Sequence, residues 1–237
     1  GVGKTTLLKK IKNGRGTSKF DKVIFVTVSS EGDALKVQKE IAQRLGLSVP
    51  SGDGSGLSSI VYNALSHERY LLLLDDVWGE LDLKQIGVPI PNKENRCKIV
   101  LSTRSSGVFQ RFVGAWCRPR VRARQVDVRN LDEHRSWELF RSMVDPTVDL
   151  DDPSILPLAE KMVQKCDGLP LALVTVGRAM AEATLAAEWR EAERQWNESP
   201  YRLKEMDQVK SSLMFSIDRL ERGTLLPCFL YCALFPE

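Results

Sequence analysis

The sequence predicts an α/β fold in which a parallel β-sheet carries helices on both faces and is followed by a helical region. Three short apolar runs, at residues 23–28, 70–74 and 98–101, predict buried parallel strands because each is too short for a helix. Amphipathic stretches separate these runs, as expected where crossover helices join parallel strands. After about Asn130 the strand pattern ends and amphipathic helices follow one another, so we expect a domain boundary there.

Helices are predicted on both sides of that boundary. Apolar residues near helical spacing predict helices over 34–45 and 57–66, and a surface loop rich in Pro, Gly and Ser separates them. Asp132 is a predicted N-cap, and Asp152 with Pro153 is predicted to start a helix that runs to about Cys166. Three further predicted helices cover residues 171–182, 187–196 and 206–220.

The charge of the chain excludes a broad electrostatic partner surface. The 237 residues include 34 basic and 31 acidic ones, a formal net charge of +3, so no bulk field favours nucleic acid or membrane.

The five cysteines are odd in number and form no CxxC pair, which indicates reduced intracellular thiols. No apolar run approaches the roughly 20 residues of a membrane span, and no charged-then-apolar leader precedes a cleavage site, so we expect no secretory targeting. We expect a cytoplasmic protein, with peripheral membrane association left open.

The ends of the sequence indicate a piece of a longer chain. The first residue is glycine, and the last ten run through an apolar segment that stops without a cap or tail. We therefore expect both a preceding strand and a following segment in the parent protein.

A glycine turn at the start of the chain predicts a phosphate site. Gly1-Val2-Gly3-Lys4-Thr5-Thr6 is the second half of the pattern GxxxxGK[ST], and a predicted helix follows it directly. Glycines let several backbone N–H groups point at phosphate, and the helix N-terminus adds partial positive charge. Lys4 supplies a cation to the outer phosphates, and the Thr5 hydroxyl is suited to Mg²⁺. The plainer interpretation is a glycine turn before a basic helix.

The second predicted strand ends at Asp75 and Asp76. A P-loop needs a further carboxylate to fix its metal, placed at the end of a neighbouring buried strand. Asp75 is predicted to hold Mg²⁺, and Asp76 to orient or deprotonate the attacking water. Two acidic residues where a strand meets solvent are the plainer alternative.

The third predicted strand is followed by Arg104. An arginine at the carboxyl end of a strand of the same sheet faces the ligand crevice, where its guanidinium can neutralise a terminal phosphate. A surface arginine beside a strand end is an equally good interpretation of the geometry.

The chain resembles one family, the NB-ARC domain of plant intracellular immune receptors that carry leucine-rich repeats. The matching segments span the chain in the family's order: GVGKTT at Gly1, FDKVIFVTVS at Phe20, LLLLDDVW at Leu71, KIVLSTR at Lys98, WELF at Trp137, GLPLAL at Gly168 and CFLYCALFPE at Cys228. Their combination is far more specific than a P-loop alone.

The resemblance implies a P-loop NTPase domain over residues 1–129, a helical ARC1 domain over 130–205 and the start of a winged-helix-like ARC2 domain over 206–237. It implies a switch that rests with ADP and is active with ATP, with Mg²⁺ and at most slow hydrolysis. The residues that match the family's nucleotide site are Gly1, Gly3, Lys4, Thr5 and Thr6 for phosphate, Thr5 and Asp75 for magnesium, Asp76 as base, and Arg104 as phosphate sensor.

The resemblance also assigns Pro170 to the adenine side of the ligand. From the residues alone, Gly168 ends one helix in a left-handed turn and Pro170 starts the next. The tryptophan at position 78, directly after Asp-Asp-Val, resembles the pattern of the subclass whose N-terminus is a coiled coil. The parent protein is therefore expected to carry a coiled coil and leucine-rich repeats and to self-associate on activation, while the family's MHD-type motif would lie beyond Glu237.

Two other function classes compete with the switch. A P-loop ATPase or kinase would need an acceptor site, a lid or an arginine supplied to a neighbour, and the sequence has no distinct signature of these. Residues 111–129 hold six arginines and one aspartate, so a nucleic-acid module is the second alternative. Since arginines alternate with other residues over 121–126 as in an edge strand, solvated arginines are the simpler interpretation, which disfavours direct nucleic-acid binding.

Overall fold

The computed structural model describes residues 1–28, 34–49, 56–92, 94–116, 123–198, 217 and 225–232. It divides into two compact units, which are described separately. Lys4–Asp127 is called the sheet unit, and Gly1–Gly3 together with Val128–Glu237 is called the helical unit.

Three parallel strands form the sheet of the sheet unit, in the order β1-β2-β3. Each predicted apolar run became a strand with ends within one residue of the prediction: β1 is Lys22–Thr27, β2 is Tyr70–Asp75 and β3 is Lys98–Leu101. Because all three run in one direction, their carboxyl ends lie at one edge of the sheet. The predicted α/β class is confirmed.

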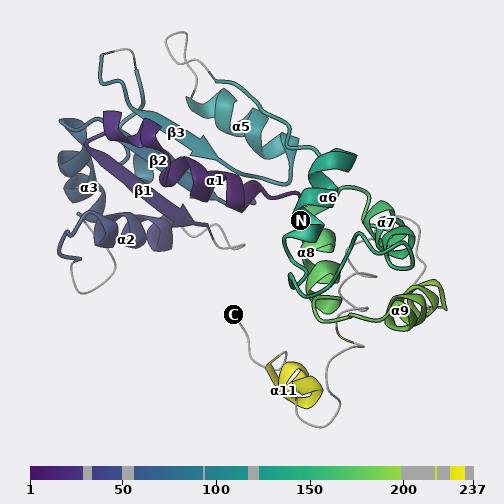
Figure 1. Ribbon diagram of the computed structural model, residues 1–237. Helices are drawn as coiled ribbons and strands as arrows, with labels where there is room; N and C mark the ends of the chain where they lie inside the picture. Colours follow the sequence, from purple (N-terminus) through teal and green to yellow (C-terminus); the bar gives the residue numbers. More distant parts are fainter. Residues whose placement is uncertain are drawn as a thin grey trace. The chain divides into compact units, whose positions relative to one another are not determined.

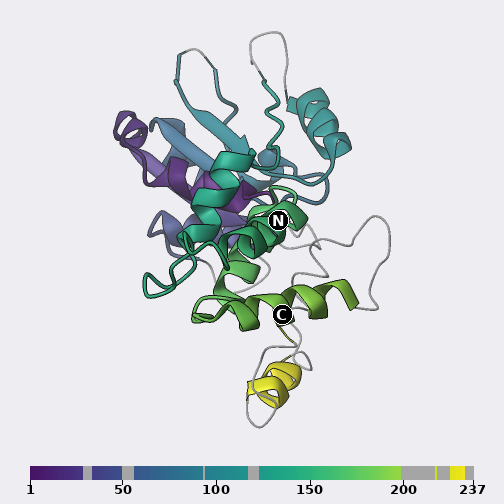
Figure 2. The same ribbon diagram turned by 45° about the vertical axis from the view of Figure 1, so that its right-hand side comes forward.

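Helices cover both faces of the sheet, as predicted. Alternate residues of a strand point to opposite faces, so Leu71 and Leu73 of β2 pack with Leu8 of α1 (Lys4–Lys12), while Leu72 and Leu74 pack into the other core. Figures 1 and 2 both show α1 lying along the sheet. The second core is shared by α2 (Ala34–Arg44), α3 (Leu57–Ser66) and α4 (Leu83–Ile86).

Helices α2 and α3 lie where the sequence predicts them, but three other elements of the sheet unit were not predicted. These are the 3₁₀ helix η1 (Arg15–Lys19), the single-turn α4 and α5 (Ser106–Trp116). Local chemistry defines α4: the Asp82 carboxylate accepts N–H groups of the first turn, and Gly87, with φ of 88°, ends it. One helical turn is too short to show a periodic apolar pattern.

The edge-strand interpretation of the arginine-rich stretch is wrong where the structure describes it. Residues 106–116 are helical, residues 123–130 form no strand, and residues 117–122 lie outside the described part. Alternation alone makes a strand only when a neighbouring backbone pairs with it, and no described strand pairs with residues 123–130.

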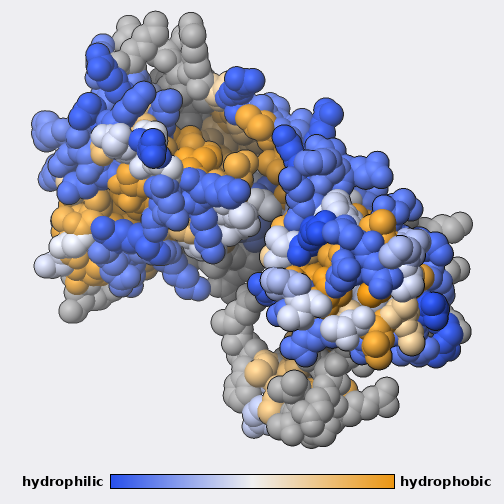
Figure 3. Space-filling model, viewed as in Figure 1, coloured by the Kyte–Doolittle hydropathy of each residue, from blue (hydrophilic) through white to orange (hydrophobic). Residues whose placement is uncertain are grey.

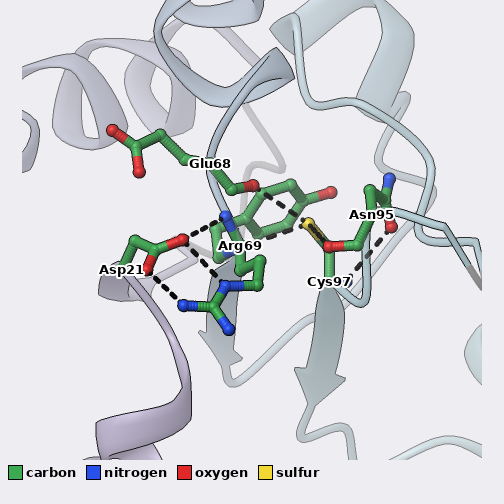
Figure 4. Close-up of polar contacts among 6 residues, drawn as sticks. Asp21, Glu68, Arg69, Asn95 and Cys97 are labelled. Carbon is green, nitrogen blue, oxygen red and sulfur yellow. Dashed lines mark hydrogen bonds and ion pairs between the residues drawn. The ribbon is translucent and has the colours of Figure 1, made fainter.

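The amino ends of the three strands are tied by polar contacts (Figure 4). Asp21 accepts the backbone N–H of Arg69 at 2.9 Å and pairs with its guanidinium at 2.8 Å. The hydrogen bonds from Arg69 lower the pKa of Asp21 from 3.8 to about 2, and the side-chain bond has the largest effect. The Cys97 sulfur accepts the Tyr70 N–H at 3.4 Å, and burial raises the pKa of this thiol. We call Asp21, Arg69 and Cys97 the clasp, because their bonds join the amino ends of neighbouring strands.

The helical unit has an apolar core of its own, whose buried residues lie between Phe140 and Ala192. Phe140 lies edge-on to Trp189, with ring centroids 6.3 Å apart, and both side chains are fully buried. The Trp189 indole donates to the Ala183 carbonyl at 2.8 Å, so the buried N–H is satisfied. The helices of this unit are α6 (Glu133–Arg141), α7 (Leu156–Lys165), α8 (Pro170–Ala179), α9 (Ala186–Glu198) and α11 (Leu225–Cys232).

The predicted helix starts in this unit were correct at α6 and wrong at α7. Asp132 caps α6 by accepting the Arg135 N–H at 2.8 Å. Helix α7 begins at Leu156 because the Asp152 carboxylate instead binds the N–H and hydroxyl of Ser154 in a preceding turn. The predicted helix over 206–220 lies outside the described residues, except for residue 217, which is helical.

Hydrophilic side chains cover much of both units on the face drawn in Figure 3, with apolar ones between them. Among the helices that the structure describes, none combines the length and the apolar character that crossing a membrane requires.

Candidate functional site

The glycine turn leads directly into the first helix, as the motif requires. Gly3 has φ of 92°, a conformation that favours glycine, and α1 begins at the next residue, Lys4. Thr5 and Thr6 are exposed in the first turn, which carries no acidic side chain to occupy its free N–H groups. Buried Leu8 fixes this helix to the sheet. The first turn of α1 can therefore accept an anion.

The two glycines of the motif belong to the helical unit. The Gly1 carbonyl accepts the N–H of Leu171, the second residue of α8, at 3.3 Å. Pro170 is the first residue of α8, and Gly168 precedes it with φ of 67°, as the sequence predicts. The adenine contact of Pro170 stays a prediction.

Asp75 is the last residue of β2, and only 3% of its surface is exposed. The Ser102 hydroxyl donates to its Oδ1 at 2.6 Å. Ser102 is itself buried and follows β3 directly. A carboxylate is thus held at the carboxyl edge of the sheet with a hydroxyl beside it.

Asp76 turns away from the strand direction. Its φ of 55° is left-handed, which aspartate tolerates better than most residues, and its N–H donates to the Ser102 hydroxyl at 2.9 Å. Each oxygen of its carboxylate accepts one hydrogen bond. Oδ2 accepts the Trp78 indole N–H at 2.9 Å, and Oδ1 accepts Arg104 Nε–H at 3.3 Å. The Arg104 guanidinium lies 4.7 Å from the centroid of the Trp78 ring. We call Asp76, Trp78 and Arg104 the Asp76 cluster.

The structure therefore brings Asp75, Asp76 and Arg104 to one edge, around Ser102. Sequence reasoning missed Ser102 and gave Trp78 no role in the site. The strand register contains the signal for Ser102: Leu74 pairs with Leu101, so the residues that follow, Asp75 and Ser102, are also opposite one another.

The side chains fit magnesium held together with phosphate. Asp75 and Thr5 provide hard oxygen ligands of the kind Mg²⁺ prefers. Among the described residues no group of three or more His, Cys, Asp or Glu side chains is arranged to hold a metal.

The described arginines of the basic stretch lie at exposed positions. Arg111 pairs with Glu80 at 3.4 Å, and Arg124 and Arg129 are exposed. Their arrangement agrees with solvated arginines.

Comparison with known proteins gives one family. Residues 1–149 match the NB-ARC domain. The chain is 37% identical over its whole length to the probable disease resistance protein At1g61300 of Arabidopsis thaliana, of which it covers 31%. It is 38% identical, again over its whole length, to the disease resistance proteins SUMM2 and RPS5 of the same plant, and covers 26% of each.

The chain thus spans between a quarter and a third of the length of these relatives. The matched region includes the glycine turn, both aspartates and Arg104. The chain therefore belongs to the NB-ARC family, in the form that plant disease resistance proteins carry.

Proposed function

We propose that this chain is an ADP/ATP-binding switch of plant defence signalling, resting with ADP and active with ATP. The observation that carries the proposal is buried Asp75 at the carboxyl edge of β2, in the unit whose first helix begins at Lys4 after a glycine turn. In open α/β sheets, ligands bind outside the carboxyl ends of the strands. Nucleotide binding by the family supports the same site.

Each residue has a role in this proposal. The backbone at Gly1 and Gly3 and the first turn of α1, with Lys4, Thr5 and Thr6, bind the phosphates. Asp75 and Thr5 hold Mg²⁺, which when bound neutralises charge on the phosphate oxygens. Arg104 meets the terminal phosphate. Pro170 packs on the adenine side.

Hydrolysis belongs to the proposal only as a slow resetting step. Asp76 orients or deprotonates the attacking water. Unassisted switch proteins hydrolyse nucleotide at around 10⁻⁴ per second, so we expect turnover of that order. Exchange of ADP for ATP drives the change of state, and moving a switch from mostly off to mostly on needs roughly 5.5 kcal/mol of differential binding.

The parent protein is proposed to work inside the cell. Residues 1–129, 130–205 and 206–237 are proposed as the nucleotide-binding, ARC1 and ARC2 regions. A coiled coil, leucine-rich repeats and self-association on activation complete the proposed switch in the parent.

Nucleotide retention by the purified chain tests the proposal. Lys4→Ala should abolish retention of ADP measured by mass spectrometry of the denatured protein, because the outer phosphates lose their cation. Lys10→Ala is the matched control, since Lys10 lies exposed in the same helix. Equal ADP content in the Lys4→Ala variant and the unmodified chain would show the site assignment to be wrong.

A further inference from the structure

We propose that Trp78 is a positioning residue of the nucleotide site, which holds the Arg104 guanidinium in place for a terminal phosphate. The inference builds on the proposed function and extends it to a residue that makes no assigned contact with the ligand. It is drawn from the Asp76 cluster, in which one indole contacts both a carboxylate and a guanidinium.

One edge of the Arg104 guanidinium is held by Asp76. Arg104 uses Nε to reach Asp76 at 3.3 Å. Within the described residues, its two terminal nitrogens make no hydrogen bond. A guanidinium presents its donors in a fixed planar fork, so fixing the Nε edge also fixes the direction of the other edge. That remaining edge is the one suited to bidentate binding of phosphate.

The Arg104 guanidinium also lies over the Trp78 ring. The centre of the group lies 4.7 Å from the Trp78 ring centroid, within the range of a cation–π contact. The Arg104 side chain is 64% exposed, so solvent weakens its ion pair with Asp76, and the carboxylate alone is a poor clamp. The indole face adds a second restraint, which limits rotation of the plane.

Trp78 also contacts Asp76 directly. Trp78 Nε1 donates to Oδ2 at 2.9 Å, while Arg104 uses Oδ1. The indole therefore orients the carboxylate that holds the arginine, in addition to contacting the arginine directly. Left-handed backbone at Asp76, with φ of 55°, turns the chain so that a residue two positions later can reach that carboxylate.

The proposal predicts a selective effect on affinity. Trp78→Leu removes both contacts and should weaken binding of AMP-PNP with Mg²⁺ by about three- to tenfold, the size expected for an exposed cation–π contact and one hydrogen bond. Binding of ADP, which has no γ-phosphate, should change less than twofold. Trp78→Phe keeps a ring but loses the N–H, so its effect should be intermediate.

Calorimetric titration with both nucleotides measures these affinities. Tyr62→Leu is the control for losing an exposed aromatic residue, because Tyr62 lies 51% exposed on α3. Arg104→Gln should weaken AMP-PNP binding selectively, and Trp78→Leu should add nothing in that background. Equal weakening of both nucleotides, or the same loss with and without Arg104, would overturn the positioning role.

A second measurement tests the geometry without any ligand. The chain has five tryptophans, so ¹⁵N-labelled protein should give five indole N–H signals in NMR spectra, and the signal absent from Trp78→Phe identifies Trp78. Asp76→Asn and Arg104→Gln should each move that signal. A signal that stays in place in both variants would overturn the inference while leaving the nucleotide site intact. Failure of the unmodified chain to bind either nucleotide would instead overturn the proposed function.

Discussion

Ser102 donates a hydrogen bond of 2.6 Å to the carboxylate of Asp75, across the carboxyl ends of two neighbouring strands. The same hydroxyl oxygen accepts the backbone N–H of Asp76 at 2.9 Å. One small side chain thus holds both carboxylate-bearing residues of the candidate site. Its removal should therefore affect the fold and the site together.

Ser102→Ala leaves an oxygen of buried Asp75 and the N–H of Asp76 without their partner. We expect the free energy of unfolding to fall by about 1–3 kcal/mol, the cost of an unsatisfied buried polar group. Urea unfolding followed by circular dichroism measures it. Ser59→Ala on the exposed side of α3 is the control, and a loss no larger than that control would contradict the role of Ser102.

Asp76→Asn separates hydrolysis from binding. Asparagine keeps the shape of the side chain and tolerates the left-handed backbone, but its amide is not a general base. Nucleotide retention should persist, while single-turnover hydrolysis of ATP should slow by about 100-fold. Unchanged turnover would remove Asp76 from the role of base.

The Asp21–Arg69 pair predicts a pH-dependent stability. The pKa of Asp21 falls from 3.8 to about 2 on folding, so its contribution is fully present above pH 3.8 and is lost as the pH falls through about 2. Asp21→Asn should lower the urea midpoint at pH 7, and the difference from the unmodified chain should shrink toward pH 2. Glu160→Gln, at an exposed position of α7, is the control, and a constant difference would count against the pair.

Gly168→Ala should destabilise the helical unit. Gly168 has φ of 67°, a conformation that strains other residues. An added Cβ would also overlap the carbonyl oxygen of Leu131, and the N–H of Leu131 donates to the Gly168 carbonyl at 2.7 Å. We expect the free energy of unfolding, measured by thermal unfolding, to fall by more than about 1 kcal/mol, because the backbone strain adds to the overlap. Gly16→Ala, where an added Cβ has open space, should change the midpoint little. Similar midpoints for both variants would refute the conformational argument.

The strands could be predicted from the sequence because a parallel sheet buries both faces, which turns residues 70–74 into an unbroken apolar run. The positions of Asp75 and Arg104 followed from that, since residues after parallel strands share an edge. Asp132 and Gly168 were predictable for a local reason: a cap and a left-handed turn depend on neighbouring backbone alone.

What could not be predicted depends on partners distant in sequence or on competing local bonds. The Ser102–Asp75 bond joins residues 27 positions apart and needs the register of β2 and β3. Asp152 binds Ser154 rather than a helix N-terminus, which moved the start of α7. The alternation over 121–126 predicted a strand, but the described residues that follow it do not pair.

The clasp of Asp21, Arg69 and Cys97 lies at the amino ends of the strands, whereas the Asp76 cluster lies at their carboxyl ends. Natural variants at these two edges should therefore differ in phenotype. Substitutions in the clasp should lower the amount of protein that accumulates in leaf tissue, because an unstable domain is degraded. Under the proposed function, substitutions in the cluster of the parent protein should leave its abundance unchanged and alter the strength of the immune response, a distinction that an immunoblot beside a cell-death assay resolves.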